Sequence, residues 1–268
     1  MVGLEIDNII IEIDGEEPPI MDGSSKFFVN ALEEVGIVQQ SKLRSEFIIK
    51  DVIHFRDDET GSEITIIPAD NYQVTTMVDY ETKVLGTQNA TLNNLKEFKS
   101  DFANARTFSF LHEIEMLLEN DLIKGGDLNN AIVYVDKKIS NETMGKLKKA
   151  FNRDKVSVKP NGILDNLNLH YQNEAARHKL LDVLGDLALI GKRIRGKVIA
   201  KKPGHYINTK FAKKVSEIIK KQEKLELDKN ILEDKVIMNQ EQIMNILPHR
   251  PPFISVSYTH LTLPTKVT

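Results

Sequence analysis

The sequence contains no cysteine, and this absence excludes two kinds of chemistry at the outset. Without thiols the chain forms no disulfide framework and offers no thiolate to a metal, so any zinc must be held by His, Asp or Glu. No apolar run reaches the length of a membrane span, and no signal peptide is recognisable at the N-terminus. These absences predict a cytoplasmic protein without a membrane span.

The chain does contain enough apolar residues for a substantial core. It has 268 residues, of which 41% are hydrophobic and 28% charged, and its net charge is −3. This size predicts more than one structural unit, and the balanced charge argues against nucleic-acid or membrane partners. Lysine clusters at 146–149, 213–214 and 220–221 are interpreted as solvated helix faces. The alternative is a basic interaction module on residues 213–224 that binds polyanions in a salt-dependent way.

Hydrophobic periodicity predicts a mixture of strands and helices. A run rich in isoleucine from Ile6 to Ile13 predicts a strand, and a helix is expected between a cap at Ser24 or Ser25 and its end at Gly36. Short alternating segments from Phe47 to Val78 indicate an antiparallel sheet. The remaining predictions are a helix at Thr107–Glu119, strands at Ala131–Val135 and Gly196–Ala200, a charged helix at Lys210–Leu225 and a linker from Glu226.

The most informative segment is an apolar helix predicted across residues 177–190. Aliphatic side chains surround its axis, which predicts that the helix is mostly buried. His178, Asp182 and Asp186 nevertheless recur at i, i+4 and i+8, so all three lie on one stripe. Burying unpaired ionisable groups is costly, and a metal ion would satisfy an imidazole and a carboxylate one turn apart. The alternative is an ordinary ion pair on an exposed helix face.

Five separated motifs then occur in an order found in one enzyme family. They are Ile20–Ser24, Arg106–Leu111, Gly125–Gly126, His178–Asp182 and Gly204–His205. In these motifs the sequence resembles UDP-3-O-acyl-N-acetylglucosamine deacetylase, a zinc amidase of bacterial lipid A synthesis, over roughly residues 2–226. The resemblance implies Zn²⁺ as cofactor and hydrolysis of the N-acetyl group of UDP-3-O-(3-hydroxyacyl)-N-acetylglucosamine, the committed step of lipid A biosynthesis.

The resemblance also implies a role for each matching polar residue. His178 and Asp182 correspond to two of three zinc ligands. Asp186 resembles the carboxylate that orients a catalytic histidine, and His205 resembles that histidine, which stabilises charge and protonates the leaving amine. Thr107 resembles a hydroxyl that joins zinc in holding the oxyanion. Without the resemblance, Thr107 would be read as the cap of the following helix and His205 as an ordinary loop histidine.

Substrate-binding positions follow from the same resemblance. Lys179 and Lys202 match lysines near the polar head of the substrate. Several apolar residues match a passage for the acyl chain, although each would by default belong to the core. These residues are Phe108, Ile114, Ile123, Leu128 and Val133.

The expected fold is α+β, built of two-layer sandwiches of sheet and helix. Residues 1–41 are expected to be the end of a first deacetylase domain, and residues 42–226 a complete second domain. After a linker at 227–236, residues 237–255 resemble the opening of a hot-dog 3-hydroxyacyl-[acyl-carrier-protein] dehydratase. His249 in that opening is interpreted as structural. The resemblance therefore implies a bifunctional parent protein, with acyl carrier protein as a second partner.

Two features of the chain limit the expected activity. The family's Glu-His pair, which supplies the general base and the third zinc ligand, has no counterpart in this sequence, so the chain is expected to be inactive on its own. The alternative function is a non-catalytic fragment that binds acyl chains and nucleotide. Residues 256–268 fit neither enzyme and read like translated sequencing-adapter DNA, so they are excluded from the fold prediction.

Overall fold

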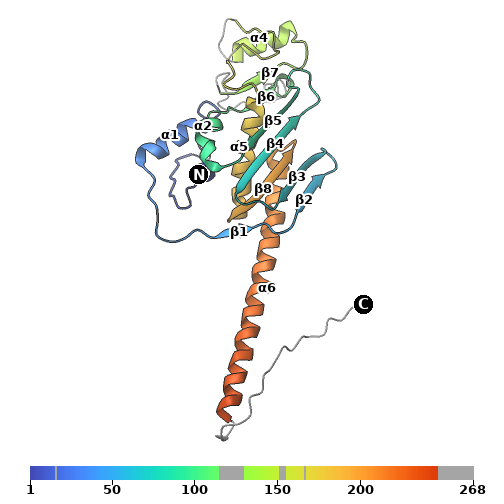
Figure 1. Cartoon of the computed structure of the whole chain (residues 1–268). Coiled ribbons are helices and arrows are strands. Elements are labelled where there is room, and N and C mark those ends of the chain that lie inside the picture. The colour runs from blue at the N-terminus through green and yellow to red at the C-terminus, as the bar shows by residue number, and fades with distance from the viewer. Residues whose placement is uncertain (16, 115–129, 151–154, 166, 247–268) are drawn as a thin grey trace. The chain divides into compact units, whose positions relative to one another are not determined.

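The computed structural model describes the chain except for residues 16, 115–129, 151–154, 166 and 247–268 (Figure 1). Its contacts divide the chain into two compact units, Met1–Ile219 and Lys220–Thr268. The fold of the first unit mixes helices and sheets, as the sequence predicts. The expected start of a hot-dog domain falls on the end of a helix and on residues outside the described part, as does all of segment 256–268. The domain boundaries stay predictions.

A mixed sheet forms the centre of the first unit. In the described residues it has six strands in the order β2-β3-β8-β4-β5, and β1 pairs with β8 beside this path. The strands are β1 (Glu46–Ile48), β2 (Ile53–Asp57), β3 (Ser62–Ile67), β4 (Tyr72–Asp79), β5 (Thr87–Leu92) and β8 (Arg193–Lys201).

The pairing of these strands corrects one prediction. β2 and β3 are antiparallel as expected, but β4 does not follow them in the sheet, because β8 lies between β3 and β4 and runs parallel to β4. The strand predicted at Gly196–Ala200 is part of β8. Local alternation shows that a segment is a strand but carries no information about a partner more than a hundred residues away.

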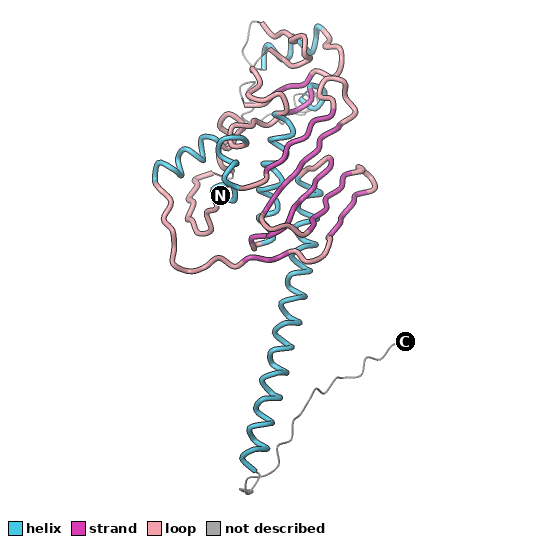
Figure 2. Tube along the Cα trace, in the orientation of Figure 1, coloured by secondary structure: helices cyan, strands magenta, loops and turns pink. Residues whose placement is uncertain are grey.

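Helices cover one face of this sheet (Figures 1 and 2). α5 (Glu174–Leu187) contacts β4 and β5. Alternate residues of β4, among them Val74 and Val78, are fully buried in the same core as Leu180 and Val183 of α5. The first turns of α6 (His205–Ile246) add Phe211 and other apolar residues to that core. α5 therefore has an apolar environment along most of its length, as its sequence predicts.

A second, smaller sheet pairs β6 (Phe108–Phe110) with β7 (Ile132–Tyr134) in parallel, and α4 (Asn141–Ala150) follows. The strand predicted at Ala131–Val135 is confirmed by β7. The helix predicted from Thr107 is wrong at its start, because residues 108–110 are extended and helical structure begins only at Leu111. The two phenylalanines of β6 alternate as a strand requires, and the backbone of β7 supplies the hydrogen-bonding partner.

The N-terminal segment agrees with the sequence at one place and departs from it at another. α1 (Lys26–Val35) is preceded by Ser25 and ends at Gly36, whose φ of +83° suits glycine. The strand predicted at Ile6–Ile13 is wrong, since these residues form no regular element and Ile10 is 89% exposed. A β-branched run needs a neighbouring backbone to become a strand, and no described strand lies beside it.

The C-terminal helix is longer than predicted. α6 begins at His205 rather than Lys210 and continues to Ile246, so the predicted linker is helical. The remaining short elements are η1 (Val2–Leu4), η2 (Leu95–Glu97), α2 (Phe98–Asp101) and η3 (Ala188–Ile190). Of the helices in the described part of the chain, none combines the length and apolar character that crossing a membrane requires.

Candidate functional site

The predicted stripe lies on α5, and its first member is held by a backbone carbonyl. His178 is buried, and its Nδ1 lies 3.1 Å from the carbonyl oxygen of Ala105. A carbonyl oxygen only accepts hydrogen bonds, so Nδ1 carries the proton and the neutral ring has its lone pair at Nε2. That Nε2 lies 3.4 Å from Oδ1 of Asp182, one helical turn further on. Two acceptor atoms thus face each other at the surface of α5.

The electrostatic surroundings keep this imidazole neutral. Burial lowers the pKa of His178, and the electrostatic contributions of Lys179 and His205 act in the same direction. The carboxylate of Asp182 and the hydrogen bond to Ala105 oppose this shift without reversing it. Neutral imidazole is the form that binds a metal ion.

The donor set fits a zinc ion. Two ligands bound to zinc at about 2.1 Å and at a tetrahedral angle are separated by about 3.4 Å, which is the observed distance from Nε2 of His178 to Oδ1 of Asp182. The other oxygen of Asp182 accepts a hydrogen bond from Lys179 Nζ at 3.1 Å. Among the described residues no group of three His, Asp or Glu side chains converges on one point, so His178 and Asp182 are a pair without a third such side chain beside them.

Asp186 contacts a different histidine. Its Oδ2 lies 2.9 Å from Nδ1 of His205, the first residue of α6, and accepts a second hydrogen bond of 2.8 Å from the amide of Asn208. Since Nδ1 donates to the carboxylate, Nε2 of His205 remains available to a ligand. His205 is largely exposed. The structure therefore brings both histidines and both aspartates to one side of α5.

Thr107 is placed by two backbone hydrogen bonds. Its N–H donates to the carbonyl of Gly23 at 2.8 Å, and its own carbonyl accepts from Ile132 at 2.9 Å. Gly23 has a φ of +80°, and a Cβ at this position would lie 1.9 Å from the carbonyl oxygen of Asn130. Only glycine fits here. Strand β6 follows Thr107, so this residue does not cap a helix directly after it.

The two lysines lie at the same end of the sheet. Lys179 Nζ is 5.5 Å from the centre of the Phe108 ring, and Lys202 follows the last residue of β8. Burial lowers the pKa of Lys179, but Asp182, together with other nearby groups, raises it overall. Lys202 forms an ion pair of 3.3 Å with Glu81 and has a φ of +49°. Both ammonium groups are thus close to the end of β4.

The five apolar positions expected to line a passage divide into three groups. Phe108 is partly buried and contacts the aromatic rings of Tyr80 and Phe110 near Lys179. Ile114 and Val133 are buried in a second core cluster. Ile123 and Leu128 lie outside the described residues.

Three polar residues of this region were missed from the sequence. Glu174 is fully buried and forms an ion pair with Arg106 at 2.9 Å, and Asn208 is fully buried beside Asp186. Glu174 precedes His178 by four residues, so it extends the stripe by one turn. This spacing was the signal that could have identified it. Arg106 belongs to a quoted motif but received no role.

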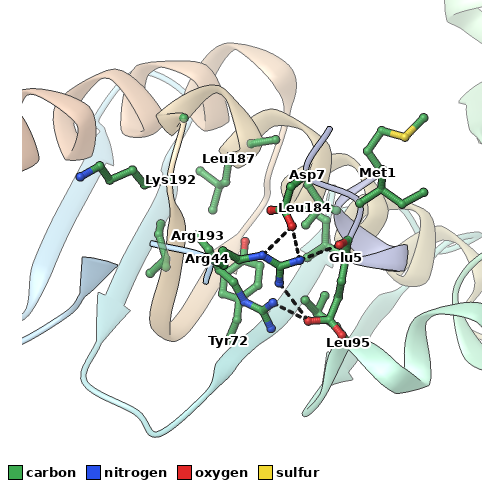
Figure 3. Close-up of a pocket in the computed structure, with 15 residues that line it drawn as sticks. Met1, Glu5, Asp7, Arg44, Tyr72, Leu95, Leu184, Leu187, Lys192 and Arg193 are labelled. Carbon is green, nitrogen blue, oxygen red and sulfur yellow. Dashed lines mark hydrogen bonds and ion pairs between the residues drawn. The ribbon is translucent and has the colours of Figure 1, made fainter. Parts of the chain in front are cut away.

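A cavity of about 320 Å³ lies elsewhere, near Leu184 and Leu187 at the C-terminal end of α5 (Figure 3). Arg44 and Arg193 reach it, but both are paired with acidic residues of the N-terminal segment, Glu5 among them. None of the site residues above lines this cavity. It is separate from the candidate site.

Comparison of the sequence with known proteins identifies a deacetylase family. A family model described as LpxC, UDP-3-O-acyl N-acetylglycosamine deacetylase, matches residues 1–157 and 143–217. The chain belongs to this family.

Individual relatives divide into two kinds. The chain is 42% identical over 253 residues to the bifunctional enzyme LpxC/FabZ of Bacteroides thetaiotaomicron, covering 94% of this chain and 55% of the relative. The corresponding enzyme of Porphyromonas gingivalis is also 42% identical, covering 96% and 55%. The UDP-3-O-acyl-N-acetylglucosamine deacetylase of Nitratidesulfovibrio vulgaris is 35% identical over 215 residues, covering 80% and 61%. The chain thus spans about half the length of the bifunctional relatives.

Proposed function

We propose that this chain is part of a zinc-dependent deacetylase that hydrolyses the N-acetyl group of UDP-3-O-(3-hydroxyacyl)-N-acetylglucosamine in lipid A biosynthesis. The observation that carries the proposal is the arrangement of Nε2 of His178 and Oδ1 of Asp182, two acceptors 3.4 Å apart at the spacing of zinc ligands. Membership of the deacetylase family supports the reaction class. Because the substrate is a nucleotide sugar, we place the reaction in the cytoplasm.

When bound, zinc acts as a Lewis acid on the acetamide carbonyl and lowers the pKa of water at the site. The chain's own residues supply the remaining parts. The hydroxyl of Thr107 donates to the oxygen that becomes negative during hydrolysis. His205, held at Nδ1 by Asp186, delivers a proton from Nε2 to the leaving nitrogen.

The two lysines and the aromatic cluster are assigned to substrate binding. Lys179 and Lys202 attract the negatively charged nucleotide head; Lys179 adjoins His178 in the sequence, and Lys202 directly follows β8. Phe108 begins the apolar path for the acyl chain. Ile114, Ile123, Leu128 and Val133 are proposed to continue this path.

The length of the matches supports a second enzyme in the parent protein. An alignment that covers 94% of the chain extends past residue 217, where the deacetylase model ends. The single-function relative covers only 80%. We therefore propose that residues 237–255 begin a dehydratase acting on 3-hydroxyacyl chains carried by acyl carrier protein.

A second candidate function is a non-catalytic fragment that binds acyl chain and nucleotide. This alternative is favoured because, among the described residues, no third His, Asp or Glu side chain joins His178 and Asp182. Under this alternative the chain retains substrate affinity through its lysines and apolar residues, and releases no acetate.

Zinc binding is the direct test. Calorimetric titration of this chain with Zn²⁺ should show at least a tenfold loss of affinity in His178→Gln and in Asp182→Asn, because loss of even a hydrogen-bond partner of a ligand typically costs about 10–100-fold. The matched control is His54→Gln, which changes an exposed histidine of β2 and should leave affinity unchanged. Equal affinity in all three variants would show that the stripe is structural.

Turnover separates the two candidate functions. Acetate release from the proposed substrate should be easily measured with the full-length enzyme of Bacteroides thetaiotaomicron as reference. We expect this chain to be slower by roughly 10²–10⁴-fold, the contribution of a general base. Comparable turnover would contradict the expected inactivity, while substrate binding without turnover would support the fragment alternative.

A further inference from the structure

The buried carboxylate of Glu174 organises the segment before Thr107. Its Oε1 accepts hydrogen bonds from the backbone N–H and the Nε of Arg106 at 3.1 and 2.9 Å. Its Oε2 accepts from Arg106 Nη2 at 3.3 Å and from the backbone N–H of His170 at 2.6 Å. Nη2 of Arg106 also donates to the carbonyl of Asn168. Glu174 is thus saturated by donors from two separate segments.

This ion pair links α5, which carries His178, to the segment that carries Thr107. Glu174 is in the first turn of α5, four residues before His178. Arg106 lies directly between Ala105, whose carbonyl contacts Nδ1 of His178 at 3.1 Å, and Thr107. The N–H of Arg106 and the carbonyl of Ala105 belong to the same peptide group, so Glu174, which binds that N–H and the Arg106 side chain, holds this peptide group against α5.

We propose that Arg106 and Glu174 are positioning residues, which hold the Ala105 carbonyl against Nδ1 of His178 and so keep the lone pair of Nε2 directed towards Asp182. The inference rests on the proposed function in one respect, the binding of a metal at Nε2. Neither Arg106 nor Glu174 contacts that metal position; both act through the segment 105–107. A hydrogen-bond partner at the second nitrogen is the usual means of fixing the tautomer of a metal-binding histidine.

A purely structural purpose is a weaker explanation of this pair. Both side chains are buried, Arg106 at 5% and Glu174 at 0% exposure. Desolvating two charges is costly, and well-packed apolar side chains of similar volume stabilise a core equally well or better. An apolar pair could not bind the backbone N–H groups of residues 106 and 170. The carboxylate is therefore suited to fixing a backbone position.

The test measures the tautomer of His178 in the metal-free, isotope-labelled chain. Long-range proton–nitrogen NMR spectra distinguish Nδ1–H from Nε2–H, and the ratio of the two forms is the readout. We compare Arg106→Lys, which keeps the charge but loses the planar fork, with the isosteric Glu174→Gln. The matched control is Thr76→Val, which removes a buried 2.9 Å hydrogen bond from Thr76 Oγ1 to the Ala176 carbonyl of the same helix.

We expect the unaltered chain and Thr76→Val to show the Nδ1–H form. The ratio of Nδ1–H to Nε2–H should fall about tenfold in Arg106→Lys and in Glu174→Gln, as loss of one ordinary hydrogen bond would produce. If Glu174→Gln does not fold, the milder Arg106→Lys decides. The inference is overturned by an Nε2–H form in the unaltered chain, by no change in Arg106→Lys, or by an equal change in Thr76→Val.

Addition of Zn²⁺ separates this inference from the proposed function. A metal at Nε2 shifts the Nε2 resonance of the unaltered chain. If the tautomer depends on Arg106 but zinc leaves that resonance unmoved, the positioning role stands and the metal site fails. If zinc shifts the resonance equally in all variants and their tautomers agree, the metal site stands and the positioning role is refuted.

Discussion

Replacing Arg106 by methionine should destabilise the chain far more than removing an exposed lysine from an ion pair. The Arg106→Met change leaves the carboxylate of Glu174 buried and charged, with its backbone donors but without a counter-ion. Breaking a buried pair from one side costs about 3–5 kcal/mol. The control is Lys99→Met, which breaks a 2.7 Å pair with Glu33 whose lysine side chain is 58% exposed. Exposed pairs contribute less than about 1 kcal/mol.

Removing the acid should cost more than removing the base. Glu174→Leu leaves the guanidinium of Arg106 without its counter-ion and also leaves two backbone N–H groups, of residues 106 and 170, without their acceptor. Each buried unsatisfied donor adds about 1–3 kcal/mol. The Glu174→Leu variant is therefore expected to lose about 5 kcal/mol or more, a large part of the stability of a typical domain.

Urea unfolding followed by far-UV circular dichroism measures these differences, since the chain has no tryptophan for fluorescence. The dependence of the unfolding free energy on urea should stay constant, so that shifts in midpoint report stability. A loss below about 1 kcal/mol for Arg106→Met, equal to that of Lys99→Met, would refute the claim that this change leaves the Glu174 carboxylate buried without a counter-ion. Equal costs for Arg106→Met and Glu174→Leu would show that the two backbone donors find other acceptors.

Three further changes test other parts of the fold. Gly23→Ala should lower the free energy of unfolding by more than about 2 kcal/mol in urea, because the added Cβ would lie 1.9 Å from a carbonyl oxygen. The control Gly61→Ala has a similar φ of +69° but open space around it, so it measures the cost of the backbone conformation alone. Asn208→Ala should lower stability by about 1–3 kcal/mol through loss of a buried bond to a carboxylate, and Asn8→Ala, which breaks an exposed 2.7 Å bond, should have little effect. Burial raises the pKa of Tyr134 to about 12, so the unfolded chain ionises first and stability should fall as pH rises from about 10 to about 12. If the difference in urea midpoint between the unaltered chain and Tyr134→Phe stays constant over this pH range, the raised pKa of Tyr134 is contradicted.

The sequence predicted those features that depend on local spacing. The positions of α1 and of the stripe on α5 follow from a period of 3.6 and from capping residues, and both are found. The strand predicted at Ile6–Ile13 failed because a strand also depends on a neighbouring backbone. The helix predicted from Thr107 failed for the converse reason, since β7 offers a partner to residues 108–110.

Long-range pairing explains what sequence reasoning missed. β8 enters the sheet between β3 and β4, and no local pattern specifies this order. Arg106 and Glu174 are 68 residues apart, so neither shows that the other is its partner. The i, i+4 spacing could identify Glu174 as a member of the stripe, but only the fold shows that its partner precedes Thr107.

The four polar residues of the stripe, taken together, meet different partners along a single helix face. At the first position, Glu174 is fully buried and every contact made by its carboxylate is with a donor. At the second and third positions, Nε2 of His178 lies 3.4 Å from Oδ1 of Asp182, the pair to which the proposed function assigns the metal. At the fourth, Asp186 binds the ring of an exposed histidine. Equal spacing in the sequence therefore places these groups in line, while the segments that meet each one determine whether it is enclosed by donors, faces a neighbouring side chain of the same helix or pairs with an exposed histidine.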